Sequence, residues 1–98
     1  MIVVARITAR DEHRDQVETI LKGLVEKVQA EEGTLVYTLH RHQNDPNVFL
    51  FYEKYRDMDA LVVHGGTDYF KAAMKEMTPL VAEKPVIEMY DEIAAILS

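Results

Sequence analysis

A single glutamate interrupts the most apolar stretch of this sequence, in a setting typical of acid–base chemistry. Residues 48–55 read Val-Phe-Leu-Phe-Tyr-Glu-Lys-Tyr. Side chains of a strand alternate between two faces, so Glu53 shares a face with Phe49, Phe51 and Tyr55. Burial among aromatic rings disfavours a charged carboxylate. We therefore expect the pKa of Glu53 to be raised toward a range useful for proton transfer.

His64 is the second candidate for proton transfer. It precedes Gly65-Gly66 at the end of a predicted short helix, where the helix dipole favours the imidazolium ion. It could accept a proton from a phenol or a hydroxyketone, or it could simply cap free carbonyls of the helix. For Glu53 the structural alternative is an ion pair or hydrogen bond that fixes the sheet, with Arg6 or Arg41 as partner.

Further candidates could line a flat cavity that binds a small-molecule substrate: Tyr37, Phe51, Tyr55, Tyr69, Phe70 and Met74. Tyrosine combines a large apolar ring with a hydroxyl group that can bind a polar substituent. The alternative is that these side chains belong to the core, with each hydroxyl group satisfied inside the protein. The sequence pattern does not separate the two for the apolar members of the set.

Signals for metal or nucleotide cofactors are weak. His40 and His42 point the same way on a predicted strand, but no third ligand is spaced nearby, so we expect no metal site. The chain has no cysteine, and we find no phosphate-binding glycine motif. We therefore expect no cofactor. Glu31 and Glu32 are interpreted as an acidic patch at a helix end, without apolar shelter and without a catalytic role.

Apolar alternation predicts four strands, over residues 2–9, 35–42, 48–55 and 86–93. The first and third are apolar on both faces, which is typical of strands inside a sheet with both faces covered. The Asn-Asp-Pro-Asn run at residues 44–47 predicts the turn between the second and third strands.

Apolar residues at helical spacing predict a long helix over residues 11–30 and a second helical segment in two pieces, 58–64 and 67–77. The expected N-terminal caps are Asp11, Asp57 and either Thr67 or Asp68, and the expected terminators are Gly33 and Gly65-Gly66. Leu61 and Val62 are expected on the buried side of the first short piece.

The order strand, helix, strand, strand, helix, strand predicts one α+β domain over residues 1–98 with the ferredoxin-like βαββαβ arrangement. Both helical segments would cover one face of the antiparallel sheet. The two-sided apolar strands then need a cover for the other face. We expect a homodimer packed sheet to sheet, with roughly 800 Å² buried on each partner.

Charge and hydropathy exclude several classes of partner. The net charge is −6, which argues against nucleic acid or an anionic membrane surface. No apolar run reaches the ~18 residues of a membrane span, and no basic segment followed by an apolar run stands at the N-terminus. A cytoplasmic location is the resulting expectation.

Several of these residues together resemble the antibiotic-biosynthesis monooxygenase family. The matching positions are Glu32-Gly33, Tyr37, Asp45-Pro46-Asn47, Phe49 through Glu53, Ala60, His64 and Phe70. They resemble the family's ordered pattern of an acidic residue with glycine, a tyrosine, an Asp-Pro turn, an apolar strand ending in Glu-x-Trp, and a helix carrying Ala and His. The resemblance implies the dimeric ferredoxin-like barrel of that family.

The resemblance implies three kinds of activity, since family members include cofactor-free monooxygenases of quinols and polycyclic phenols, haem-degrading enzymes, and an isomerase of a phosphorylated autoinducer. The haem pattern is not met: Tyr55 replaces its tryptophan, Met74 stands at the iron-binding histidine, and the first strand lacks its asparagine. Tyr69 stands where quinol-type relatives often carry a second histidine. The run from Tyr52 to Asp57 is nearer to the isomerase.

We therefore expect a cofactor-independent monooxygenase that acts on a small phenol or quinol-type aromatic. His64 would be the base or hydrogen-bond partner, Glu53 its orienter or a second acid–base group, and the tyrosines polar contacts. One alternative is an acid–base isomerase of a small hydroxyketone, with or without a phosphate. Another is a non-catalytic binding module that keeps only the fold and the pocket.

Overall fold

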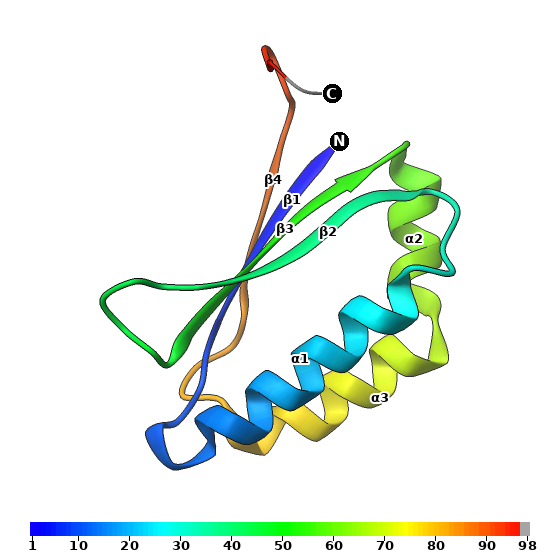
Figure 1. Cartoon of the computed structure of the whole chain (residues 1–98). Coiled ribbons are helices and arrows are strands. Elements are labelled where there is room, and N and C mark those ends of the chain that lie inside the picture. Colours follow the sequence, from blue (N-terminus) through cyan, green and yellow to red (C-terminus); the bar gives the residue numbers. More distant parts are fainter. Residues whose placement is uncertain (97–98) are drawn as a thin grey trace.

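Four antiparallel strands form one sheet in the order β2-β3-β1-β4, and all the α-helices lie on one side of it (Figure 1). This computed structural model describes residues 1–96, so the last two residues of the expected domain lie outside the described residues. The arrangement confirms the predicted ferredoxin-like α+β fold. The elements are β1 (Ile2–Thr8), α1 (Arg14–Val28), β2 (Thr34–Arg41), β3 (Val48–Tyr55), α2 (Met58–Gly66), α3 (Asp68–Met77) and β4 (Val86–Tyr90), with short 3-10 turns at Asp11–His13 and Thr78–Leu80.

The two strands that are apolar on both faces occupy the centre of the sheet, as predicted. β1 pairs with β3 on one side and with β4 on the other, so that Ala5 lies opposite both Phe51 and Ile87. On β3, burial alternates strictly, and Phe49, Phe51, Glu53 and Tyr55 are the buried set. The face turned toward the helices therefore holds the core, with Glu53 as its one carboxylate on this strand.

The long helix follows its predicted apolar stripe but begins later than predicted. Val17, Leu21, Leu24 and Val28 are buried on its inner side. Asp11 does not cap it, because the helix begins at Arg14 after a 3-10 turn. The Asp11 carboxylate instead accepts a hydrogen bond of 3.2 Å from the Asn47 amide in the β2–β3 turn.

Gly33 does not terminate α1, which ends five residues earlier at Val28. The glycine permits a close approach between the α1–β2 connection and α2. A Cβ atom at Gly33 would lie 2.5 Å from Cβ of Ala60, a distance at which backbone or side chain must move. The backbone oxygen of Gly33 also accepts a hydrogen bond of 2.9 Å from the amide of Arg56. Absence of a side chain therefore lets this connection pack on the start of α2.

The second helical segment is divided into two helices as predicted, but the first of them ends at Gly66, two residues later than predicted. The carboxylate of Asp57 caps α2 by accepting a 2.9 Å hydrogen bond from the amide of Ala60, and Thr67 caps α3. Gly65 and Gly66 are the last residues of α2 and do not interrupt it. The expected burial of Val62 is wrong: this side chain is 65% exposed, because α2 turns its Ala60 and His64 side toward the sheet.

The last strand is shorter than predicted and ends at Tyr90. Its residues Ile87 and Met89 lie opposite Ala5 and Val3 of β1, yet both are more than half exposed because no described helix covers this edge. Within residues 1–96, no helix has the length and apolar character that crossing a membrane requires.

Replacing Gly33 by alanine should destabilise the fold. The added methyl group would force the α1–β2 connection away from Ala60, at a cost of about 1–3 kcal/mol for overpacking. Gly23 is the matched control, since a Cβ there meets nothing within 4 Å and Gly23→Ala in a helix should stabilise by about 0.5–1 kcal/mol. Chemical denaturation of both variants measures the difference, and equal stability would contradict the role given to Gly33.

Candidate functional site

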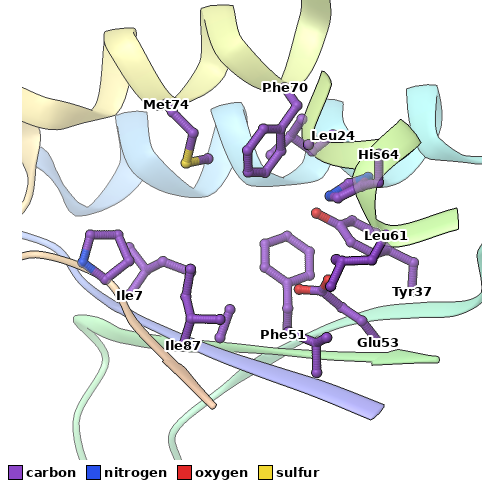
Figure 2. A pocket seen from close by; sticks show the side chains of 14 residues that line it. Ile7, Leu24, Tyr37, Phe51, Glu53, Leu61, His64, Phe70, Met74 and Ile87 are labelled. Carbon is purple, nitrogen blue, oxygen red and sulfur yellow. The ribbon is translucent and has the colours of Figure 1, made fainter. Parts of the chain in front are cut away.

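A cavity of about 110 Å³ lies between the inner face of the sheet and the helices α2 and α3 (Figure 2). Its wall is almost entirely apolar. Among residues 1–96, no lysine or arginine lines it, and its polar side chains are those of Tyr37, Glu53 and His64. The other lining residues are Val3, Ala5, Ile7, Leu24, Phe51, Leu61, Gly65, Phe70, Met74, Pro85 and Ile87. Both predicted catalytic residues and four of the predicted substrate contacts, Tyr37, Phe51, Phe70 and Met74, therefore lie on one cavity wall.

The three polar side chains gather at one end of the cavity (Figure 2). Strand pairing places Tyr37 of β2 directly opposite Glu53 of β3, with both side chains on the inner face. His64 reaches the same place from α2, and its ring centroid is 5.2 Å from that of Tyr37. Phe51 and Phe70 flank the pair, with centroid distances of 4.6 Å to Tyr37 and 4.8 Å to His64 respectively. The sheet and two helices thus enclose acid, imidazole and phenol together.

Glu53 is 5% exposed and accepts a hydrogen bond of 2.5 Å from the hydroxyl group of Tyr55. Burial raises its pKa, while the Tyr55 hydrogen bond and the nearby His64 act in the opposite direction. The predicted direction of the pKa shift therefore agrees with the structure. Of the structural alternative, the ion pair with Arg6 or Arg41 is not formed, because Arg41 pairs with Glu18 and Arg6 is exposed. A hydrogen bond is formed, but with a different residue. The observed partner is the Tyr55 hydroxyl.

His64 is 3% exposed and does not cap the end of its helix. Its carbonyl oxygen accepts a 2.8 Å hydrogen bond from the Thr67 hydroxyl, so the capping is done by that side chain. The imidazole ring instead points inward. Its Nδ1 atom lies 3.0 and 3.1 Å from the two carboxylate oxygens of Glu31. The other ring nitrogen, Nε2, has no hydrogen-bond partner among residues 1–96.

Glu31 belongs to the site, and its assignment to an exposed acidic patch is wrong. Its side chain is only 6% exposed. The apolar shelter that the local sequence lacks comes from α2 and α3, which contribute His64 and Tyr69 from 33 and 38 residues away. The one local signal was Gly33, since the close approach that it permits brings this connection against α2.

Two predicted substrate contacts, Tyr55 and Tyr69, lie behind the cavity wall and not on it. The Tyr55 hydroxyl binds Glu53, and the Tyr69 hydroxyl binds Glu31. Burial, with the adjacent Glu31, raises the pKa of Tyr69 to about 12, and burial with Glu53 raises the pKa of Tyr55 still further. Both phenols therefore stay protonated at neutral pH and act as hydrogen-bond donors to the two carboxylates.

Tyr37 differs from the other two tyrosines, because its hydroxyl has no partner among the described residues and its side chain lines the cavity. Burial, followed by the charges of Glu53 and Glu31, raises its pKa well above the usual value. A protonated hydroxyl without a protein partner can bind a polar group of a ligand.

The two neighbouring histidines His40 and His42 are engaged in local contacts. Nε2 of His40 lies 2.8 Å from the Thr38 hydroxyl, and Nδ1 of His42 accepts from the amides of Asn44 and Asp45 in the β2–β3 turn. Within residues 1–96, no group of three or more His, Asp or Glu side chains is placed to hold a metal ion.

Comparison with known proteins gives matches to one family and to several individual proteins. Residues 1–76 match the family described as "Antibiotic biosynthesis monooxygenase". The Bacillus subtilis (strain 168) protein named "Putative monooxygenase YcnE" is 30% identical over 71 residues, covering 72% of this chain and 75% of that protein. A solved structure from Caulobacter crescentus CB15, described as a "putative antibiotic biosynthesis monooxygenase", has a TM-score of 0.89 and 41% identity, covering 95% of this chain and 89% of that one.

A further match is to the Synechocystis sp. PCC 6803 protein named "Uncharacterized protein sll1783", which is 24% identical over 90 residues. The match covers 92% of this chain and 61% of that protein, so the chain spans about three fifths of that relative's length.

Replacing Glu53 by glutamine should stabilise the protein at neutral pH. Because burial raises the pKa of Glu53 above its usual 4.5, its contribution to stability is complete below pH 4.5 and is lost as the pH rises through the raised value. Glutamine stays neutral and still accepts the Tyr55 hydrogen bond. A tenfold change in the acid dissociation constant of Glu53 corresponds to about 1.4 kcal/mol, or roughly 6–11 °C in Tm for a domain of this size.

Thermal melts of both proteins between pH 4 and pH 8 measure this effect. We expect the Tm advantage of Glu53→Gln to grow with pH and to vanish near pH 4, since both proteins then carry a neutral group. An advantage that does not depend on pH would show that the carboxylate is not destabilised by its burial.

Proposed function

The chain belongs to the antibiotic biosynthesis monooxygenase family, and we propose that it is a cofactor-independent monooxygenase of a small phenol or quinol-type aromatic. The observation that carries the proposal is the cavity itself. It is apolar along most of its wall and holds His64, Glu53 and the Tyr37 hydroxyl at one end. An apolar wall with a few polar groups at one end suits a ring with hydroxyl substituents.

His64 is the proposed base. Its Nε2 atom would take the proton from a phenolic hydroxyl of the substrate, and Tyr37 would donate a hydrogen bond to the phenolate that forms. The electron-rich phenolate would then react with O₂ at a ring carbon. A hydroperoxide forms at that carbon, and its O–O bond then breaks. One oxygen atom stays on the ring as a carbonyl in place of the C–H bond, and the other leaves as water with two hydrogens of the substrate, so that a hydroquinone becomes a hydroxyquinone. The substrate supplies the electrons that reduce both atoms, so the reaction balances without a reductant.

Cavity size favours substrates of one ring. A cavity of about 110 Å³ is slightly smaller than an engineered protein cavity of about 150 Å³ that binds benzene. A polycyclic phenol would require movement of wall residues such as Met74, whose long flexible side chain separates the cavity from an outer groove. We therefore propose monocyclic hydroquinones as the first substrates to test.

Charge on the wall disfavours the phosphorylated hydroxyketone of the isomerase alternative. A phosphate dianion loses strong hydration when it is buried, and it needs cations or several donors to compensate. The cavity offers it the carboxyl group of Glu53, with Glu31 behind His64, and no lysine or arginine among the described lining residues. A neutral aromatic avoids this cost.

We also propose that two copies of the chain pair through the outer face of the sheet. No described helix covers this face (Figure 1), and its centre carries the apolar side chains of Val4, Val36, Leu50 and Tyr52. A second copy, packed sheet to sheet, would remove these apolar side chains from water. The proposal stands beside the monooxygenase proposal, and either can fail without the other.

An oxygen electrode tests the proposed activity with a panel of monocyclic hydroquinones. We expect O₂ uptake and a product that gains one oxygen atom and loses two hydrogen atoms. His64→Ala should lower kcat/KM at least about 100-fold, as loss of a general base does. His42→Ala, in the exposed β2–β3 turn, is the matched control and should keep wild-type rates. Labelled O₂ followed by mass spectrometry shows whether the new oxygen comes from the gas.

Three outcomes would contradict the monooxygenase proposal. The first is uptake no faster than that of a heat-killed sample with every hydroquinone. The second is proton–deuterium exchange on a hydroxyketone without O₂ consumption, which would favour the isomerase. The third is tight binding of aromatics without any turnover, which would favour a binding module.

Light scattering coupled to size-exclusion chromatography tests the pairing at micromolar concentration. Tyr52→Glu would place a charge between Val4 and Thr38 in the middle of the outer face and should give monomers. Val62→Glu, on the exposed side of α2, is the control and should leave the assembly unchanged. A wild-type protein that is already a monomer would disprove the pairing.

A further inference from the structure

The carboxylate of Glu31 is bound by groups from three secondary-structure elements. Its Oε1 atom accepts a 2.9 Å hydrogen bond from the Thr34 hydroxyl at the start of β2. Its Oε2 atom accepts from the hydroxyl of Tyr69 on α3. His64 of α2 contacts both oxygens through Nδ1, at 3.0 and 3.1 Å. A buried carboxylate with this many partners is arranged as an ionised acceptor, because each partner can donate a hydrogen bond to it.

These contacts determine which nitrogen of His64 carries a proton. An ionised carboxylate has only acceptor atoms, so each group that touches it must donate. The hydroxyl groups of Thr34 and Tyr69 meet this requirement. Nδ1 meets it only when it is protonated. A neutral His64 ring then has its lone pair on Nε2, the nitrogen that has no protein partner among residues 1–96.

We propose that Glu31 is the positioning residue of this site: it holds His64 as the Nδ1–H tautomer, so that Nε2 is the proton acceptor for the substrate bound in the cavity. This inference rests on the proposed function for the identity of the substrate. The inferred tautomer of the His64 ring does not depend on the proposed function, because it is a property of the protein without substrate.

The same contact favours the charged state of His64 that proton transfer creates. When the substrate proton arrives at Nε2, the ring becomes an imidazolium ion within 3.0 Å of the Glu31 carboxylate. Because the ring is only 3% exposed, the carboxylate takes over part of the stabilisation that bulk water would give the ion. Glu31 therefore acts twice, first on the orientation of the base and then on its charge.

Other titratable groups that face His64 do not replace Glu31 in this role. Tyr37, Tyr55 and Tyr69 all have pKa values raised by burial, so they remain neutral donors at neutral pH. Glu53 approaches from β3, but it accepts its hydrogen bond from the Tyr55 hydroxyl, and burial raises its pKa. Among residues 1–96, Glu31 is the carboxylate in direct contact with the ring.

Nitrogen-15 NMR of labelled protein tests the proposal without any substrate. At a pH at which the ring is neutral, wild-type His64 should show a protonated Nδ1 and an unprotonated Nε2. Glu31→Gln keeps an acceptor for Nδ1–H without the charge and should retain this pattern. Glu31→Ala removes the acceptor, so the spectrum should change to a mixture of the two tautomers. Glu32→Gln, the exposed neighbour, is the matched control and should change nothing.

Turnover of an active hydroquinone is the second measurement. Glu31→Ala should lower kcat at least about tenfold, the smaller end of losses seen when an orienting partner is removed, with KM changed less than threefold. Glu31→Gln should recover part of the loss, because orientation is kept and only charge is missing. Glu32→Gln should keep the wild-type kcat.

Several results would overturn the proposal. A wild-type ring protonated at Nε2 would do so whether or not any hydroquinone is a substrate. An unchanged tautomer in Glu31→Ala would do so even if turnover falls, because Glu31 would then only support the fold. Should circular dichroism show that Glu31→Ala is unfolded, the wild-type tautomer and the kcat of Glu31→Gln decide the question. If no substrate is turned over, the spectrum alone decides it.

Discussion

The interior of this protein holds polar groups that are largely shielded from bulk water, and the contacts behind the cavity wall pair most of them. The Glu31 carboxylate is the clearest case. It sits in the α1–β2 connection, yet its partners Thr34, His64 and Tyr69 belong to β2, α2 and α3. Leaving such a group unpaired would cost several kcal/mol, about as much as a small domain has to spare. The connection, both helices and the strand are therefore held in one relative position.

Gly33 allows the backbone to come close enough to α2 for Glu31 to make these contacts. Glu31 reaches His64 only because its connection packs against α2, and that approach leaves no room for a side chain at position 33. The backbone hydrogen bond from the Arg56 amide to the Gly33 oxygen also holds the connection to the segment between β3 and α2. Two residues of one short segment, Glu31 and Gly33, therefore connect the path of the backbone to the position of His64 in the cavity wall.

The fold and half of the polar site follow from local sequence pattern. Residues of β3 alternate with a period of two, so the burial of Glu53 between Phe51 and Tyr55 could be predicted from its position alone. Glu31 could not be predicted in this way, because its shelter comes from residues that lie more than thirty positions further along the chain. The exposure of Val62 could not be predicted for a related reason: in Leu61 to His64 every residue but one is apolar, and only packing decides that His64, together with Leu61, faces the cavity.

The two carboxyl groups of the site differ in their surroundings, and this difference separates their roles. Glu31 meets three donors, which suit an ionised group, while Glu53 meets one and lies among aromatic rings that raise its pKa. Paired titratable groups with opposing environments commonly divide acid and base functions between them. Here the charged member lies behind the imidazole and supports a base. The member whose pKa burial raises lies on the cavity wall, where it can exchange a proton more readily than an ordinary carboxylate.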